Sequence, residues 1–593
     1  MARYNLIDED WIPVLLDNSG EVKKVNLKEL FENSQNYVSL ACDTKTQEFA
    51  ILRFLLSILQ TVFSRFDSEG EKYEYIELNE NFKPIEKVSQ DYEENYVEDL
   101  FGTWETLFNE REFPDIISKY LDKWHDRFYL FDDKYPFYQV TGDLITPDKI
   151  YKNRKVGSIS GKNINRKISE SGNKIALFSP KYEYKNNKEI LSEDEIARWL
   201  LTLHGYIGTS DKTKFKGDNK TSSKGWLFDI GGLYLSGENL FETLLFNTVL
   251  VDSFESYKNI QRPCWEYSPS ELIDRYLTSN NPDNLAELYT TWSRAVYIDP
   301  ETDASKPFEM NIVKVPDVNK VNNFLEPMTI WRFNREGDNK GKFTPKKHVL
   351  NQSMWRSFGN IIEEDIIKEE NESKNEKKTN NKMPGIIEWY KTLSDVLEID
   401  NITLNSVSMK DDGNATSWVP VDEICDSLSI ADIIITDDDE NGWKNRILQT
   451  ISDTKYCVSV IYKRFIQDIK EIRNLESKLF VDQNVEELYF IIDEPFRDWI
   501  TSIDKNDSKD EKCNEWKITL RRLVLNQANS LIKEAGNRDF IGIVKDEKVK
   551  NIATSYSSFK YYLNDKLKIK EKEENNGEND QKQDGTHDDI KDN

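Results

Sequence analysis

The residues best suited to binding chemistry are lysines and arginines gathered in three polar segments. Residues 149–174 hold eight Lys or Arg against one acid, 212–224 hold five against one, and 332–347 hold six against two. Cationic side chains neutralise phosphates, so three such segments in one acidic chain favour a nucleic-acid surface over ordinary solvated loops. The candidate phosphate contacts are Lys212, Lys214, Lys216, Lys220, Arg332 and Arg335.

A second candidate is the short polar segment 410–417, KDDGNATS, which separates two strand-like runs at 402–409 and 418–424. Gly413 permits close approach of backbone to a ligand, and the amide of Asn414 can hydrogen-bond base edges. A small hairpin tip of this kind suits the minor groove of DNA. The same residues are also common turn formers, and a turn alone is the more frequent explanation.

Sequence patterns for catalysis are missing. The chain has no GxxxxGK(S/T), GxGxxG, GxSxG or HExxH motif. The acid runs 437–440 and 363–365 could be imagined as magnesium ligands, but a helix cap and a solvated face are the more common interpretations. Five cysteines form no CxxC pair and no two of the four histidines lie within one helical turn, so we expect no metal and no cofactor.

Composition limits the class of protein. The 593 residues carry 107 Asp and Glu against 80 Lys and Arg, a net charge of −27, which argues against a free-standing DNA-coating protein. The 14 Trp, 27 Tyr and 29 Phe exclude global disorder. The start, MARYNLIDEDWIPV, lacks a signal-peptide pattern, and the longest apolar stretch, 49–63, is shorter than a bilayer span. We therefore expect a cytoplasmic protein with reduced cysteines and no membrane partner.

The elements that must position these segments are of mixed type. Residues 4–16 predict a strand and a turn, and Asp43 or Thr44 can cap a helix that continues to residue 63, with Gln47 completing a capping box. A second helix is predicted at 97–124. The later patterns predict strands from 225 (WLFDIGGLYL) and near 292–298 and 328–333, with helices at 239–251 and after Pro384.

From about residue 440 the pattern is helical. One long helix reaching residue 472 and three more at 484–503, 511–535 and 546–567 predict an up-down four-helix bundle over 437–568. Thr436 and the acids 437–439 are expected to cap its start. Residues 569–593 are expected to form a disordered acidic tail, because 571–593 hold nine acids against three lysines. The predicted fold class is α+β, with a large mixed α/β domain over 1–436 before the bundle.

Several blocks of the chain resemble the CasA family, the large subunit of the type I-E CRISPR Cascade complex. They occur in the family's order across about residues 4–360: YNLIDEDWIPV, RFYLFDDKYPFYQV, KGWLFDIGGLYLSGENLFETLLFNTVLV, RPCWEYSP, LYTTWSRAVYI, EPMTIWRFNREG and MWRSFGNII. The resemblance implies a non-catalytic subunit that recognises the protospacer-adjacent motif in double-stranded DNA and helps open the duplex for guide RNA pairing. It also implies partners: other Cascade subunits, the CRISPR guide RNA and the helicase-nuclease.

The resemblance also implies site residues. The family's glycine loop, which contacts the motif and wedges the DNA duplex, corresponds here to Gly413, Asn414, Ala415 and Thr416. The glutamine that forms the wedge in the family is absent from this segment, and Asn414 is its nearest chemical equivalent. The cysteine-rich insertion of some members is absent too, so no zinc is expected. The family's first long loop, which engages the guide RNA and neighbouring subunits, resembles the segment after residue 161, with candidates Lys162, Asn163, Asn165, Arg166 and Lys167.

Two other functions stay open at this point. A metal-dependent nuclease or other phosphoryl-transfer enzyme would need three or more carboxylates converging in one cleft. A structural adaptor without DNA contact would be favoured if the basic segments and the 410–417 tip lay on opposite faces.

Overall fold

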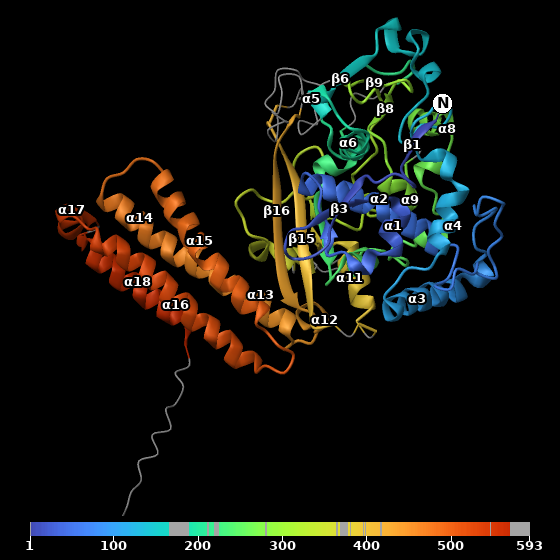
Figure 1. The fold of residues 1–593 in the computed structure, drawn as a ribbon. Coiled ribbons are helices and arrows are strands. Elements are labelled where there is room, and N and C mark those ends of the chain that lie inside the picture. Colours follow the sequence, from blue (N-terminus) through green and yellow to red (C-terminus); the bar gives the residue numbers. More distant parts are fainter. Residues whose placement is uncertain are drawn as a thin grey trace, which may run out of the picture. The chain divides into compact units, whose positions relative to one another are not determined.

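The computed structural model describes residues 2–164, 189–209, 213–218, 224–278, 281–362, 366–367, 378–379, 381–394, 396–397, 399–414, 418–545 and 547–569. The chain divides into two compact units, Met1–Leu448 with Ile500–Lys505, and Gln449–Trp499 with Asn506–Asn593. Helices and strands are both present (Figure 1), so the predicted mixture of α and β structure is confirmed. The domain limits predicted at 436 and 568 stay predictions, and the predicted tail lies outside the described residues except for residue 569.

The core of the first unit is built around α2 (Lys45–Phe63). The backbone N–H of Gln47 donates to Thr44 Oγ1 at a distance of 3.0 Å. Thr44, one of the two predicted candidates, is therefore the N-cap. Every residue of α2 from Thr46 onward is buried, and the helix packs against α6 (Glu193–Tyr206) and α9 (Leu285–Tyr289). The one arginine of this helix, Arg53, forms a bidentate ion pair with Glu326, with nitrogen–oxygen distances of 2.6 and 2.7 Å.

A long antiparallel hairpin of β15 (Asn401–Asp411) and β16 (Pro420–Ala431) carries the candidate tip (Figure 1). The sheet order is β16-β15-β7, with β7 at Gly231–Ser236. The register pairs residue 401 with 431 and residue 408 with 231, and it shifts at Lys410/Asp411, just before the tip. The hairpin was predicted, but β16 continues seven residues beyond the predicted end at 424.

Shorter strands complete the first unit. The further sheets are β1 (Arg3–Asn5) with β5 (Tyr129–Phe131); β3 (Val22–Val25), β2 (Ile12–Leu15) and β4 (Ser39–Leu40); β6 (Gly157–Ser160), β9 (Glu309–Lys314) and β8 (Arg294–Tyr297); β11 (Phe343–Pro345), β10 (Trp331–Phe333) and β14 (Asn381–Lys382); and β12 (Ile366–Ile367) with β13 (Lys378–Thr379).

Three predicted elements were wrong in extent or type. The helix predicted at 97–124 is two helices, α3 (Glu93–Glu110) and α4 (Ile116–Lys123). It breaks because Arg111 takes a left-handed conformation (φ 62°) and Pro114, which lacks an N–H, follows. Residues 226–229 form a short 3₁₀ helix instead of the start of a strand, and the helix predicted at 239–251 is α7 (Leu240–Phe246).

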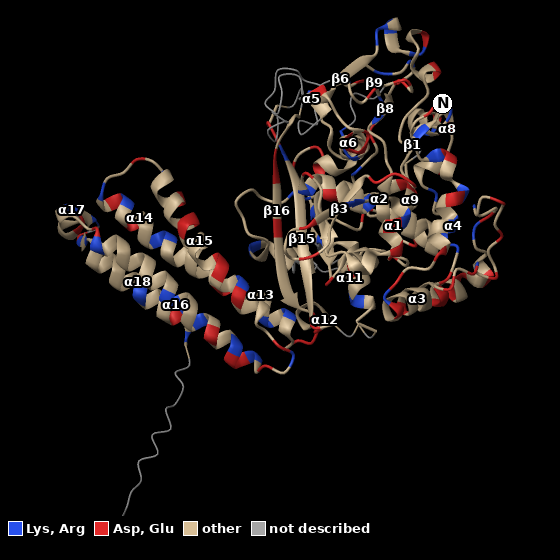
Figure 2. Cartoon of the chain, in the orientation of Figure 1, with Lys and Arg blue, Asp and Glu red and all other residues tan. Residues whose placement is uncertain are grey.

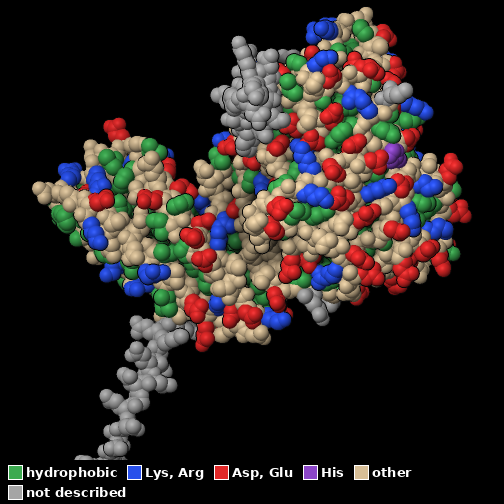
Figure 3. All heavy atoms as spheres, in the orientation of Figure 1, with side chains coloured by type: hydrophobic (Ala, Val, Ile, Leu, Met, Phe, Trp, Pro, Cys, Tyr) green, Lys and Arg blue, Asp and Glu red, His purple; other side chains and the backbone are tan. Residues whose placement is uncertain are grey.

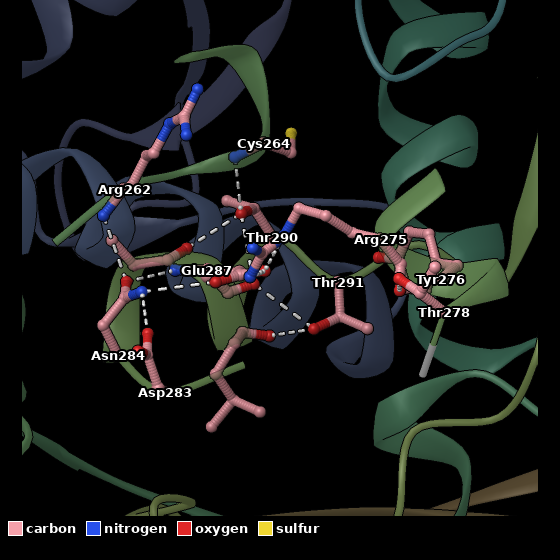
Figure 4. Close-up of polar contacts among 12 residues, drawn as sticks. Arg262, Cys264, Arg275, Tyr276, Thr278, Asp283, Asn284, Glu287, Thr290 and Thr291 are labelled. Atoms are coloured by element: carbon pink, nitrogen blue, oxygen red, sulfur yellow. Dashed lines mark hydrogen bonds and ion pairs between the residues drawn. The ribbon is translucent and has the colours of Figure 1, made fainter. Parts of the chain in front are cut away.

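Polar side chains fix α9 to the neighbouring α8 (Pro269–Leu277), as Figure 4 shows. Two nitrogens of Arg275 lie 3.0 and 2.6 Å from Glu287 Oε1. Asn284 caps α9 by accepting from the N–H of Glu287, and the N–H of Cys264 donates to Thr290 Oγ1. These contacts fix α9 to α8 and to residue 264, and they pair the buried carboxylate of Glu287 with Arg275.

The second unit is helical. Helix α13 (Trp443–Tyr456), a π-helical turn (Cys457–Tyr462) and α14 (Lys463–Ile472) follow one another without a break. The other elements are α15 (Leu479–Thr501), α16 (Lys509–Lys533), α17 (Asn537–Ile541), β17 (Ile543–Lys545), β18 (Lys548–Lys550) and α18 (Ile552–Leu567). Helix α18 packs against both α14 and α16, and the boundary between the two units falls inside α13 and α15.

The predicted cap at the start of this helical region is correct for one residue only. Asp437 Oδ2 accepts a hydrogen bond of 2.8 Å from the N–H of Trp443, the first residue of α13. Thr436 instead ends a separate short helix, α12 (Ile433–Thr436).

Candidate nucleic-acid interface

Residues 411–414 of the hairpin tip form a turn that is held by hydrogen bonds to aspartate side chains. The N–H of Gly413 donates to Asp411 Oδ1 (2.9 Å) and the N–H of Asn414 donates to Asp412 Oδ1 (3.1 Å). Gly413 has φ 68°, which favours glycine, and both it and Asn414 are exposed. Because these two N–H groups are already bonded inside the turn, a ligand would meet the side chains of the tip. Ala415 and Thr416 lie outside the described residues.

Two of the basic segments meet the base of this tip. Lys347, at the end of 332–347, places Nζ 3.2 Å from Asp411 Oδ2. Lys224, at the end of 212–224, places Nζ 4.9 Å from the ring centroid of Trp418. Segments far apart in sequence are thus gathered at the point where β15 ends and β16 begins.

Asp229 is the shared counter-charge of this cluster. Its carboxylate lies 2.7 Å from the Nζ of Lys224 and 3.1 Å from the Nζ of Lys320. Burial alone would raise the pKa of Asp229, but the ammonium groups of Lys320 and Lys224 hold it well below its usual range. Burial lowers the pKa of the nearby Lys347. Asp229 therefore stays ionised and pairs with both lysines, of which Lys224 lies beside Trp418 at the base of the tip.

Close packing of backbone holds the end of 332–347 in place. A Cβ added to Gly231 would lie 2.3 Å from the carbonyl oxygen of Lys346, so this position requires glycine. His348, which directly follows the segment 332–347, places Nε2 2.9 Å from the carbonyl oxygen of Gly232. The start of β7 is therefore the common support of the hairpin and of this segment.

The first and second basic segments are joined by backbone hydrogen bonds. The N–H of Tyr151 donates to the carbonyl of Lys214, and the N–H of Lys216 donates to the carbonyl of Lys149; both donor–acceptor distances are 2.9 Å. Lys216 is exposed, which suits a phosphate contact. The ammonium of Lys214 is half-buried and donates to the carbonyl of Asp218 (2.6 Å), so part of its capacity is used internally. Lys212 and Lys220 lie outside the described residues.

The remaining predicted residues are placed separately. Lys162 Nζ lies 3.4 Å from Glu189 Oε1, and Asn163 is buried, a position that does not suit direct contact with RNA. Asn165, Arg166 and Lys167 lie outside the described residues. Arg332, in β10, and Arg335, in the turn that follows it, are both exposed. Their roles stay predictions.

Comparison with known proteins decides the family. The family model for CRISPR-associated protein Cse1 matches residues 5–527. The chain belongs to the Cse1 family. A CasA/Cse1 protein of Thermus thermophilus is 25% identical over 367 residues, which are 61% of this chain and 61% of that protein, so the match spans about three fifths of the curated relative.

Solved structures share the fold of this Cse1 family member. The crystal structure of Thermobifida fusca Cse1 has a TM-score of 0.71 at 22% identity, covering 95% of this chain and 98% of that one. A chain in a CRISPR RNA-guided surveillance complex has a TM-score of 0.60 at 12% identity, covering 95% and 100%.

Acidic side chains of this Cse1 family member gather away from the tip. Residues 67–115, which include α3, carry 16 Asp and Glu against four Lys and Arg. The ribbon of α3 carries several stretches coloured red for Asp and Glu in Figure 2, and red side chains gather in the same region on the face that Figure 3 shows. Phosphates are repelled from such a surface, so we expect nucleic acid to avoid it.

The described part of this Cse1 family member has neither a cluster of metal-binding side chains nor a membrane-spanning helix. Across the ranges that the structure describes, no three His, Cys, Asp or Glu side chains come together in a way that could hold a metal ion. No helix in those ranges has both the length and the apolar character needed to cross a membrane.

Sequence reasoning missed Asp229, Lys320 and Trp418 as members of the site. Lys224 and Lys347 were counted as charges but not singled out. One signal was available: Asp229 interrupts the otherwise apolar run WLFDIGGLYL, and a carboxylate in such a run usually has a specific partner.

Proposed function

We propose that this chain is the non-catalytic large subunit of a type I-E CRISPR Cascade complex. In that role it recognises the protospacer-adjacent motif in double-stranded DNA, helps open the duplex for guide RNA pairing and helps recruit the helicase-nuclease. Its partners are the other Cascade subunits, the CRISPR guide RNA and the target duplex, in the cytoplasm. The observation that carries the proposal is the meeting of two basic segments with the base of an exposed hairpin tip in a Cse1 family chain.

The charge distribution supports this division of labour. In RNA-guided recognition, base pairing reads the sequence and protein reads a short motif and the shape of the duplex. Such a subunit needs a few well-placed cations at one point and not a basic surface throughout. Lys224 and Lys347 supply them, and the carboxylates of Asp229 and Asp411 limit their freedom. We further propose that the helical unit is the four-helix bundle of this subunit.

The adaptor alternative receives no support from this arrangement, because the ends of two basic segments lie at the tip instead of on opposite faces. The nuclease alternative needs a convergence of carboxylates, and among the described residues none of the kind that could hold a metal ion is found.

The tip is tested by the double variant Asn414→Glu, Thr416→Glu in the assembled complex. We expect motif-dependent duplex binding to be lost, because two carboxylates would face the DNA, while incorporation of the subunit is unchanged. Asn401→Glu, an exposed position at the far end of β15, is the matched control and should bind normally. Normal duplex binding by the double variant would refute the assignment of the tip. Sequencing of small RNA that co-purifies with the native chain tests the assembly itself.

A further inference from the structure

A groove of about 430 Å³ lies in the helical unit, between α18 on one side and the π-helical turn with α14 on the other. Its floor is the stacked pair Phe465 and Phe559, whose ring centroids lie 5.0 Å apart and which are both buried. Its rim carries Tyr456 and Tyr562, which are 46% and 45% exposed. Large aromatic faces are thus presented to solvent above an apolar floor.

Each of the two rim tyrosines has a cation beside its ring. Arg464 Cζ lies 5.4 Å from the ring centroid of Tyr562, and Lys566 Nζ lies 5.1 Å from that of Tyr456. Lys566 is also paired with Asp453 over 2.7 Å, which holds the ammonium at the rim. Alternation of stacking surfaces with cations is the arrangement by which proteins bind single-stranded nucleic acid.

Two further observations mark the groove as more than a packing gap. Ser555 lines it and is only 4% exposed, yet its hydroxyl has no hydrogen-bond partner among the residues that the structure describes. A buried hydroxyl without a partner is costly, and a ligand with a donor or acceptor would relieve that cost. The opposite wall contains the π-helical turn Cys457–Tyr462, a local distortion that is frequent at functional sites.

The charge of the helical unit also fits a polyanion better than that of the first unit does. Residues 449–499 and 506–569 contain 20 Lys and Arg against 19 Asp and Glu, in a chain whose net charge is −27. Of the two carboxylates in the groove, Asp468 is already paired with Lys550. The other, Asp565, would oppose a phosphate.

We propose that this groove binds single-stranded nucleic acid, with an unpaired base on the rim tyrosines and its phosphates beside Arg464 and Lys566. A peptide could also fill an apolar groove, but an exposed ring with a cation beside it, found twice along one rim, favours unpaired bases that are joined by phosphates. The source of the strand rests on the proposed function: opening of the target duplex exposes unpaired bases.

The test measures binding of the full chain to fluorescein-labelled oligothymidylate of about 12 nucleotides, a length within the usual site size. Tyr562→Ala should weaken binding about tenfold, as expected for loss of one stacking contact, and Tyr562→Phe should restore it. Phe490→Ala, in α15, is the matched control: its ring is 81% exposed and does not line the groove, so binding should be unchanged. Asp565→Asn should strengthen binding about threefold, because it removes the opposing charge.

Equal effects of Phe490→Ala and Tyr562→Ala, or equal binding of single strand and duplex, would overturn the proposal. Thermal unfolding of each variant guards against loss of the fold, and the Tyr562→Phe chain is the second safeguard. The two proposals fail separately. If oligothymidylate does not bind while the assembled complex still recognises its motif, only the groove is wrong. If the strand binds in the groove while the chain incorporates into no RNA-guided complex, only the proposed function is wrong.

Discussion

Lys347 Nζ lies 3.2 Å from Asp411 Oδ2. Lys347 ends a basic segment, and Asp411 ends β15 at the base of the candidate tip. The same carboxyl group accepts from the N–H of Gly413, so one side chain connects the turn of the tip to a cation 64 positions away in sequence. The position of the tip and the position of the basic segment are therefore coupled.

Asp229→Asn should reduce discrimination between duplexes with and without the motif more than it reduces affinity for DNA. The change removes the counter-charge that Lys224 shares with Lys320, so Lys224 is freer to meet any phosphate but is no longer held beside the tip. In the assembled complex we expect the ratio of motif to non-motif duplex affinity to fall about three- to tenfold, while non-motif affinity is unchanged or higher. Competition binding with the two duplexes measures this. Glu301→Gln, an exposed carboxylate, is the control; an unchanged ratio for Asp229→Asn would contradict the role of Asp229.

Arg166→Glu combined with Lys167→Glu should weaken incorporation of the chain into its complex. These residues belong to the segment predicted to engage the guide RNA, where charge reversal would repel phosphates. Co-purification with tagged partner subunits is the measurement, and Lys306→Glu, an exposed lysine elsewhere, should incorporate normally. Normal incorporation of the double variant combined with failure of DNA binding would mean that the roles of this segment and the tip are exchanged.

Glu326→Gln should destabilise the first unit by about 3–5 kcal/mol. The carboxylate is buried, pairs with both terminal nitrogens of Arg53 and accepts from the indole of Trp226, so its loss leaves a buried guanidinium without its counter-charge. Urea unfolding measures the change. Replacing both partners, Arg53→Met with Glu326→Gln, should cost less than the single change, because no buried charge then remains. A larger loss in the double variant would show that the pair acts mainly through packing.

Acidification should destabilise the first unit, because His204 is buried in a position that disfavours its protonated form. Burial, together with the nearby charge of Arg294, lowers the pKa of His204 to about 3, and its Nε2 lies 3.1 Å from the carbonyl oxygen of Tyr138. In the unfolded chain the pKa is about 6.5, so between about pH 6.5 and pH 3 the unfolded state binds the extra proton. The stabilisation that neutral His204 contributes is complete above about pH 6.5. Below that pH it falls by about 1.4 kcal/mol for each pH unit.

The variant His204→Gln isolates this effect. Between about pH 7 and pH 5 the free energy of unfolding of the wild type should fall by about 2 kcal/mol more than that of the variant, measured in urea. Parallel profiles for the two chains would show that His204 titrates normally in the folded state.

Local sequence patterns predicted the elements that depend on local interactions. The Thr44 cap, the buried helix that follows it and the β15–β16 hairpin were predicted because capping, apolar spacing and turn chemistry act within a few residues. The break at Arg111 was missed because a left-handed residue other than glycine gives little warning in sequence. The basic segments were found by counting charges, but their meeting at the base of the tip could not be predicted, since Lys347 and Asp411 lie 64 positions apart and such pairing is set by the whole fold.

Helix α2 has a consequence for synthesis of the chain on the ribosome. It is buried on all sides, and its neighbours include α4, α6, α9, β15 and β16, the last of which ends at Ala431. About 370 residues must therefore be made after α2 before its apolar surface is fully covered, which takes roughly 20–75 s at about 5–20 residues per second. During that interval the apolar side chains of α2 are not yet covered in the nascent chain, so we expect its yield in cells to depend on chaperones and on the rate of translation.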